Sequence, residues 1–331
     1  DMFQTASHAN GLMPGISDWH TGNTESPQVN AFSVAMFNAG ARRPGLPPAS
    51  ASMMHCVSTT ELRSYATFAN NVKYISYFNF GPAYTGAACW SDSYASYTGT
   101  AYLNNRVARV DDLAAPGLMR PSRVALLYPM SSDYWGHLNI SDRRAVFLAL
   151  SHEYYQPEIV TEEQVADGAL ASYDALYVLD PLVLSGAQAR IAEWVRAGGL
   201  LWACSDAASR NAFNEPEDLL EPLAGLRRAL VPSAGWPAST GLEAEGDRVV
   251  APVAGEAAFR PHRVVEGNRP RSVDWPGARV RARYDDGQPA WLEGTVGKGR
   301  VVYVAHRAGQ SYSAKVVRHG EKLWADTGRG L

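Results

Sequence analysis

A histidine and a cysteine stand next to each other at the end of a short apolar stretch. The stretch reads SMMHCV, the pair is His55 and Cys56, and a segment with a helical pattern follows. In parallel α/β folds, reactive side chains lie at the carboxyl ends of strands. An imidazole there can transfer protons near neutral pH, and an ionised thiol can act as a nucleophile. The structural alternative is a hydrogen-bonded His55 beside a Cys56 that packs as a small apolar side chain.

Two further groups of polar and aromatic residues follow other apolar stretches. The loop SDWHTGNTE contains Asp18, Trp19, His20 and Glu25. The loop after VKYISYFNFG, together with the end of that stretch, contributes Asn79, Tyr84, Trp90 and Asp92. Sugars are bound by this mixture, because their C–H faces stack on aromatic rings while their hydroxyl groups bond to polar side chains. We expect a sugar-binding lip with Asp18 or Glu25 as a catalytic carboxylate. Solvated loops are the structural alternative.

Alternating strands and helices would have to position these residues. We expect strands near 13–18, 52–57 and 72–80, with helices over 28–43, 58–70 and 101–115. This alternation is typical of parallel sheets with crossover helices. A closed (β/α)8 barrel takes about 200 to 250 residues. Residues 1–115 are therefore predicted to be the C-terminal part of such a barrel, or else an independent small layer packed on the next domain.

The pattern restarts after the linker PGLMRP. We expect strands at 123–128, 174–180 and 200–205, a strand and turn at 157–165, and helices at 142–155 and 185–199. This order predicts a doubly wound, flavodoxin-like domain over residues 121–313. Further strands within 279–306, joined by glycine-containing turns, are predicted to extend or cap its sheet. Residues 314–331 would begin a further segment.

Composition excludes several classes of function. The chain has 331 residues, of which 46% are hydrophobic and 19% charged, as in a globular protein of about two domains. A net charge of -3 gives no electrostatic reason for nucleic-acid binding. No apolar run approaches the roughly 18 residues that span a membrane. Three widely spaced cysteines without a Cys/His cluster predict neither a disulfide framework nor a metal or cofactor site.

Four stretches in the second half carry a family resemblance: RPSRVALLYPMSSDYW, DALYVLD, WVRAGGLLW and GKGRVVYVAHRAGQSY. Their order and spacing over about 121–313 resemble the trimerisation domain of glycoside hydrolase family 42 (GH42) β-galactosidases, whose fold is similar to class I glutamine amidotransferases. The preceding half is similar to the last strands of that family's catalytic barrel. LMPGISDW resembles its sixth strand, SMMHCV its seventh and VKYISYFNFG its eighth.

The resemblance implies a retaining glycosidase that uses two glutamates about 5 to 5.5 Å apart. The acid/base glutamate would follow strand 4, which precedes this stretch of chain, and His55 stands at the position that matches the nucleophile. We therefore expect a C-terminal fragment of a glycoside hydrolase, hydrolysing or binding glycosides at the barrel mouth with an incomplete catalytic pair. The alternative is a non-catalytic carbohydrate-binding or oligomerisation scaffold. The resemblance also implies a homotrimer, with Tyr134 and Trp135 as interface candidates.

Cys204 is a second cysteine at a predicted strand end. Amidotransferase-like folds hold a nucleophilic cysteine on a sharp turn after a strand, but here Ser205 and Asp206 follow in place of glycine. A thiolate needs a base or a positive site, and His306 is the histidine in a matching position. We expect a structural cysteine, with a Cys-dependent amidase as the weaker hypothesis. The pairs at 42–43, 143–144 and 227–228, all Arg-Arg, are predicted to be solvated surface.

Overall fold

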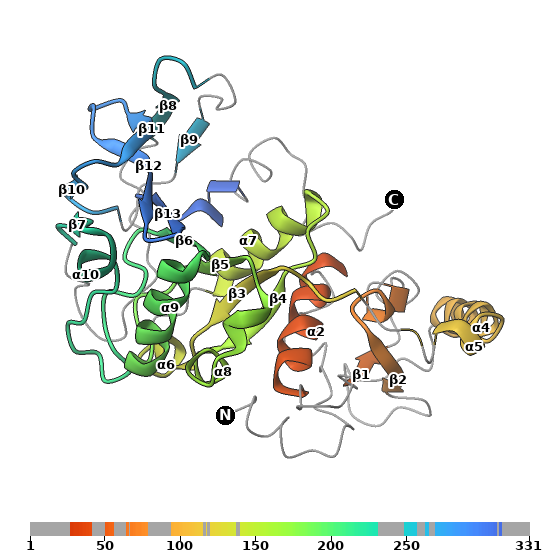
Figure 1. Cartoon of the computed structure of the whole chain (residues 1–331). Coiled ribbons are helices and arrows are strands. Elements are labelled where there is room, and N and C mark those ends of the chain that lie inside the picture. The colour runs from red at the N-terminus through yellow and green to blue at the C-terminus, as the bar shows by residue number, and fades with distance from the viewer. Residues whose placement is uncertain are drawn as a thin grey trace. The chain divides into compact units, whose positions relative to one another are not determined.

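The computed structural model (Figure 1) describes residues 27–41, 50–55, 64–65, 67–78, 94–114, 117, 120–136, 140–230, 248–256, 262–264, 269–309 and 311–312. The chain divides into two compact units, with the boundary between Pro121 and Ser122. The predicted α/β class is confirmed. The predicted strand at 13–18 lies outside the described residues.

Among its described residues, the first unit contains two parallel strands, three bounded helices and further helical residues at 64–65 and 67–68. Strands β1 (Ser50–His55) and β2 (Val72–Phe78) pair in parallel, and the helices are α2 (Pro27–Ala41), α4 (Tyr94–Val107) and α5 (Asp111–Ala114). Parallel strands cannot be joined by a tight hairpin, which fits the crossover between them. Val34 of α2 and Val72 of β2 form a buried apolar contact cluster with Phe37 and Ile75. This arrangement is consistent with part of a (β/α) barrel.

The second unit is built on a nine-stranded mixed sheet with the order β4-β3-β5-β6-β13-β12-β11-β8-β9. Its parallel strands are β3 (Val124–Tyr128), β4 (Glu158–Thr161), β5 (Ala175–Val178), β6 (Leu200–Cys204) and β13 (Gly299–Val304). Its antiparallel strands are β8 (Arg248–Pro252), β9 (His262–Val264), β11 (Arg279–Tyr284) and β12 (Pro289–Val296). A separate antiparallel pair joins β7 (Arg227–Arg228) and β10 (Val273–Asp274).

The parallel strands follow the order of a doubly wound sheet. The first strand of the unit, β3, lies between β4 and β5, as strand 1 lies between strands 2 and 3 in flavodoxin-like sheets. The last strand, β13, occupies the fifth position beside β6. The strands expected within 279–306 therefore extend the sheet, as predicted. Between β3 and β5 the chain order reverses, and such a switch point forms a crevice at the carboxyl ends of the strands.

Helices cover both faces of this sheet. They are α6 (Met130–Tyr134), α7 (Ile140–His152), α8 (Glu162–Ala166), the 3-10 turn Ala169–Ser172, α9 (Ser185–Ala197) and α10 (Leu220–Ala224). Because strand side chains alternate between faces, Leu127 packs into the core shared with α8, α9 and α10, whereas Tyr128 contacts α7 on the other face. In Figure 1, α7 and α9 accordingly lie on opposite sides of the sheet.

Helix α9 shows how the sequence specifies one of these layers. Ala187, Ile191 and Val195, spaced four residues apart, are fully buried against the sheet, which is the apolar stripe of an amphipathic helix. The helix ends where Gly198 has a φ of 137°, a backbone conformation that residues other than glycine rarely adopt. The predicted helix at 185–199 and the strands at 123–128, 174–180 and 200–205 are confirmed.

The strand predicted within 157–165 is confirmed, but a short helix takes the place of the turn expected after it. Strand β4 ends at Thr161, and the short helix α8 begins at the next residue. The Thr161 side chain accepts a hydrogen bond from the backbone N–H of Gln164, and the Gln164 side chain accepts one from the backbone N–H of Thr161. This reciprocal capping box stabilises a short helix where the sequence predicted only a turn.

Candidate functional site

His55 is the predicted sugar-site residue that the structure describes, and it lies at the carboxyl end of β1. His55 is the last residue of β1, and its register partner is Phe78, the last residue of β2. The chain therefore leaves both strands at the same edge, which is the edge where barrel enzymes hold their active sites. The other predicted site residues lie outside the described residues: Asp18, Trp19, His20, Glu25, Asn79, Tyr84, Trp90 and Asp92, as does Cys56.

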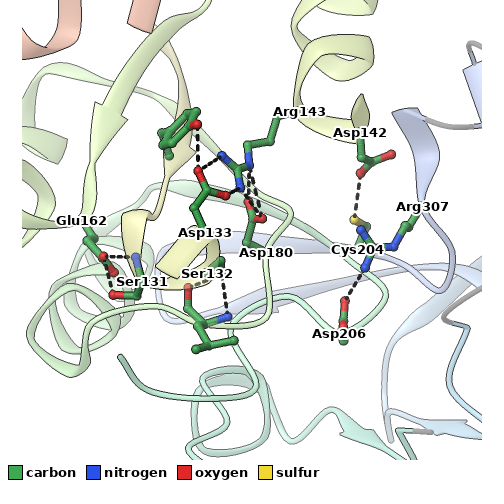
Figure 2. Close-up of polar contacts among 12 residues, drawn as sticks. Ser131, Ser132, Asp133, Asp142, Arg143, Glu162, Asp180, Cys204, Asp206 and Arg307 are labelled. Atoms are coloured by element: carbon green, nitrogen blue, oxygen red, sulfur yellow. Dashed lines mark hydrogen bonds and ion pairs between the residues drawn. The ribbon is translucent and has the colours of Figure 1, made fainter. Parts of the chain in front are cut away.

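A buried polar network occupies the switch point of the second unit (Figure 2). Arg143 of α7 pairs with Asp133 of α6 and with Asp180, and its Nε lies 3.0 Å from Asp180 Oδ2. Asp133 follows β3 and Asp180 follows β5, so the two carboxylates come from either side of the point where strand order reverses. The Arg143 guanidinium lies 4.1 Å from the centre of the Tyr128 ring, and Tyr128 donates a hydrogen bond to Asp133.

Burial controls the ionisation of this network. Burial of the Asp180 carboxyl raises its pKa to about 6, although the attraction of Arg143 opposes the rise. Burial alone would lower the pKa of the Arg143 guanidinium. That pKa is nevertheless raised, because of the interactions with Asp180, Tyr128 and Asp133. A shared buried cation between two carboxylates is costly to disrupt, because removing one partner leaves the other charge uncompensated.

Glu162 links the segments that follow β3, β4 and β5 by hydrogen bonds. Its carboxylate accepts hydrogen bonds from the Ser131 backbone N–H, the Ser131 hydroxyl and the Leu184 backbone N–H. These donors follow β3 and β5, whereas Glu162 follows β4. Burial raises the pKa of Glu162, and the hydrogen bonds from Ser131 and Leu184 oppose that rise. The carboxyl edge of the sheet is thus held by side-chain bonds rather than by loop backbone alone.

Cys204 is buried at the end of β6, with its Sγ 4.0 Å from Asp142 Oδ2. Burial, followed by the charge of Asp142, raises the pKa of its thiol well above the ordinary value. His306 Nδ1 lies 3.1 Å from the Tyr284 hydroxyl. A neutral buried thiol is a weak nucleophile, so this environment favours the structural interpretation of Cys204 over amidase chemistry.

The prediction that the arginine pairs are solvated surface is wrong for Arg143 and Arg228. Both side chains have no exposed surface, and Arg228 pairs with Asp218 at 2.6 Å. One sequence signal does exist for Arg143. It stands three and four residues before the buried Val146 and Phe147, so helical periodicity places it on the buried stripe of α7. The pair at 42–43 lies outside the described residues.

The described residues limit two other classes of site. Among them, no group of three or more His, Cys, Asp or Glu side chains is arranged to hold a metal ion. Within the same part of the chain, no helix is both long enough and apolar enough to cross a membrane.

The comparisons with known proteins bear on the fold. No protein-family model matches the sequence, and no curated protein matches it. A catalytic mutant of a GH42 β-galactosidase from G. stearothermophilus matches 98% of this chain with a TM-score of 0.67 at 17% identity. The β-galactosidase from Bacillus circulans sp. alkalophilus matches 93% with a TM-score of 0.67 at 14% identity. This chain has a GH42-like fold.

An exo-β-1,4-mannosidase from Opitutaceae bacterium strain TAV5 has a related structure. It matches 94% of this chain with a TM-score of 0.59 at 14% identity. The matches cover 50% of the first β-galactosidase, 49% of the second and 57% of the mannosidase. The chain therefore spans about half the length of the solved structures that it resembles, and at these identities the likeness concerns the fold.

Proposed function

We propose that this chain is part of a carbohydrate-active glycoside hydrolase related to β-galactosidases, which hydrolyses or binds glycosides at the mouth of a (β/α) barrel. The observation that carries the proposal is the GH42-like fold, which extends over 98% of the chain in one comparison. Solved structures of this fold include β-galactosidases and an exo-β-1,4-mannosidase. A glycoside with a β-linked hexose is therefore the first substrate class to test.

The proposed site surrounds the carboxyl ends of β1 and β2. His55 ends β1 next to Phe78, and the loops after these strands supply the other groups. Asp18, Glu25 and His55 are the proposed catalytic residues. The proposed sugar-binding residues are Trp19, His20, Asn79, Tyr84, Trp90 and Asp92. Aromatic rings would stack on the sugar while carboxylates and the amide bond its hydroxyl groups.

The chemistry of retaining hydrolysis makes His55 the informative position. One carboxylate attacks the anomeric carbon and a second carboxyl group protonates the leaving oxygen. An imidazole can transfer a proton, but it does not form the glycosyl ester that a carboxylate forms. If Asp18 or Glu25 supplies the attacking carboxylate, hydrolysis requires an acid from elsewhere. An incomplete pair supports the alternative function, a carbohydrate-binding or oligomerisation scaffold that has lost its nucleophile.

Turnover and binding assays on the whole chain separate these functions. Release of nitrophenol from aryl β-galactosides and aryl β-mannosides would be compared for the parent chain and for the variants Asp18→Asn, Glu25→Gln and His55→Gln. Glu193→Gln, which changes an exposed carboxylate on α9, is the matched control. Turnover that survives in the control and is lost in Asp18→Asn or Glu25→Gln supports the hydrolase.

Other outcomes decide for or against the alternative. Binding of galactose or mannose oligosaccharides without turnover would support the scaffold function. A chain that neither binds nor hydrolyses either sugar class would refute both the hydrolase and the carbohydrate-binding scaffold. His55→Glu adds a direct test of the incomplete pair, because restoring a carboxylate at the strand end should raise aryl-glycoside turnover above that of the parent chain.

We also propose that the second unit is an amidotransferase-like trimerisation domain and that the assembled protein is a homotrimer. The strand order β4-β3-β5-β6-β13 supports the first part, since it is the order of doubly wound sheets. Sedimentation of the purified chain tests the second part. A monomer at micromolar concentration would contradict the trimer without bearing on glycoside binding.

A further inference from the structure

Two exposed aromatic rings stand on adjoining turns at the carboxyl edge of the second unit. Tyr134 is 61% exposed and Phe213 is 75% exposed. Trp135 links the two turns, because its indole N–H donates a hydrogen bond of 2.9 Å to the Ala212 carbonyl oxygen. We call Tyr134, Trp135 and Phe213 the aromatic ledge. Burying large apolar side chains is the main stabilising term in folding. The exposure of two such rings on adjoining turns therefore suggests that they bind a ligand.

The turn that carries Phe213 is braced by its own side chains. Asn211 Oδ1 accepts hydrogen bonds from the backbone N–H groups of Phe213 and Glu215, at 2.9 and 3.0 Å. Arg210 donates to the Asn214 carbonyl oxygen at 2.7 Å, and Asn214 has a φ of 63°. A positive φ outside glycine is a strained conformation that the surroundings must maintain. The ring at position 213 is therefore presented on a fixed scaffold.

The opposite side of the aromatic ledge is fixed by the buried network. Tyr134 ends α6, the helix that also carries Asp133 and Ser132. Asp133 is held by Arg143, and the Ser132 hydroxyl donates to the Leu182 carbonyl oxygen at 2.9 Å. Both turns of the aromatic ledge are thus anchored to rigid elements. Fixed groups lose little conformational entropy on binding, which is what a small ligand of limited contact area requires.

The available area indicates the size of the ligand. A fully covered aromatic side chain buries roughly 150 to 250 Å², so covering the exposed parts of Tyr134 and Phe213 removes roughly 300 Å² from water. A stable protein interface buries about 800 Å² on each partner. The aromatic ledge is therefore small for a protein contact but suits one flat apolar face laid on each ring.

Charge indicates the nature of the ligand. Two charged side chains of opposite sign, Arg210 and Glu215, brace the Phe213 turn. Arg210 and Asn211 both form hydrogen bonds within the turn. Balanced charge favours a neutral ligand over a phosphate or a nucleic acid. Pyranose sugars are neutral ligands whose flat C–H faces stack on aromatic rings.

We infer that the aromatic ledge binds one or two pyranose rings of a neutral oligosaccharide, as a second sugar site on the unit that lacks the barrel strands. The inference goes beyond the proposed hydrolysis and does not depend on it, since it rests on the aromatic ledge alone. A site of this kind would hold a polysaccharide chain without cleaving it. Tyr134, which the family resemblance makes a candidate for a subunit interface, would then contact sugar.

Two-dimensional NMR of the whole chain tests the inference at a single atom. The Trp135 indole N–H joins the two turns of the aromatic ledge, and its resonance is assigned by loss of the signal in Trp135→Phe. Titration with β-1,4-galactobiose and β-1,4-mannobiose should shift that resonance. We expect Phe213→Ala and Tyr134→Ala each to weaken binding about tenfold, the effect of removing a central aromatic contact.

Matched variants make the test specific. Phe213→Tyr keeps a ring and should bind within about twofold of the parent, since the apolar face is retained. Tyr154→Ala removes an aromatic side chain that is 96% exposed in the same unit but lies outside the aromatic ledge, and it should leave binding unchanged. Asp18→Asn and Glu25→Gln should also leave the Trp135 titration unchanged, which separates this site from the barrel mouth.

Three results would overturn the inference. The Trp135 resonance could remain unshifted by both disaccharides. Binding could persist equally in Phe213→Ala and Tyr134→Ala. Finally, Phe213→Ala could change the sedimentation coefficient while sugar binding is absent, which would identify the aromatic ledge as a contact between copies of this chain. Glycoside hydrolysis at the barrel mouth is measured separately and would be unaffected by any of these three results.

Discussion

Replacing Arg143 by methionine would test the buried network at the switch point. The substitution keeps a long unbranched side chain but removes the cation that Asp133 and Asp180 share. Arg143 and Asp180 have no exposed side-chain surface, so water cannot take over the lost interaction. The Asp180 carboxylate would be left as an uncompensated charge in a medium of low polarity.

The structure fixes the size of the expected loss. Breaking a buried ion pair by removing one partner costs about 3 to 5 kcal/mol, and we expect the free energy of unfolding of the second unit to fall by that amount at pH 8. Arg143→Lys keeps the charge but loses the planar fork that bonds two carboxylates, so its loss should be smaller. The exposed pair Arg190–Glu193 supplies a control, since Arg190→Met should change stability little.

The loss should depend on pH with a definite sign. The pKa of Asp180 in the folded chain is raised to about 6 from its ordinary value of 3.8. A carboxyl group with a raised pKa favours the folded state fully below the unfolded value, and this contribution is lost as pH rises through the folded value. The rise of about two units corresponds to about 3 kcal/mol. Without Arg143 the pKa rises further, so the variant should recover towards parent stability as pH falls from 8 to 5.

Urea denaturation combined with hydrogen exchange of the β5 amides measures this loss within the second unit. The double variant Arg143→Met/Asp180→Leu should regain most of the loss, because it removes the unpaired charge as well as its partner. A deficit below about 1 kcal/mol, the range of a surface pair, would refute the reasoning. So would a deficit of equal size at pH 5 and pH 8.

Three other features of the second unit give predictions. Iodoacetamide should modify Cys204 in urea but not in the folded chain, because burial keeps the thiol neutral. Mass spectrometry locates the label, and labelling of Cys204 in the folded chain would support a reactive thiol. Thr161→Ala should lower the free energy of unfolding by about 1 kcal/mol through loss of the capping box, with Thr161→Ser retaining most of it. Gly299→Ala should lower it by about 1 to 3 kcal/mol, because an added Cβ would lie 2.0 Å from the Val195 carbonyl oxygen. Gly186→Ala, where the nearest atom to the added Cβ lies 3.7 Å away, should cost less.

The sheet of the second unit could be predicted because its strands carry the signal themselves. The stretches at β3, β5 and β6 are short continuous apolar runs bounded by polar residues, as in strands buried on both faces. Helix α9 has an apolar stripe and a glycine stop. Such local patterns reflect burial directly. The strands within 279–306 could be predicted only as an extension of the sheet. The position of β13 beside β6 could not, since it depends on pairing between distant segments.

The buried network could not be predicted from local patterns. Arg143 and Asp180 are 37 positions apart in the chain, and each looks like an ordinary charged residue near the end of an element. Their contact exists because the chain order reverses between β3 and β5, which brings the two loops and the start of α7 to one place. Only the helical spacing of Arg143 from Val146 and Phe147 indicated burial, and paired arginines are usually solvated.

The network and the aromatic ledge are parts of one physical arrangement. A buried Arg–carboxylate cluster seldom adds more stability than apolar packing of equal volume, so its presence is better explained by what it fixes. It fixes α6, because Asp133 belongs to that helix. Helix α6 ends at Tyr134, and the next residue bonds to the turn that carries Phe213. The buried network therefore also holds in place the two exposed rings, which do not pack in the core. Arg143→Met should accordingly weaken disaccharide binding at the aromatic ledge under conditions where the variant is still folded, whereas a network that served stability alone would leave binding by the folded fraction unchanged.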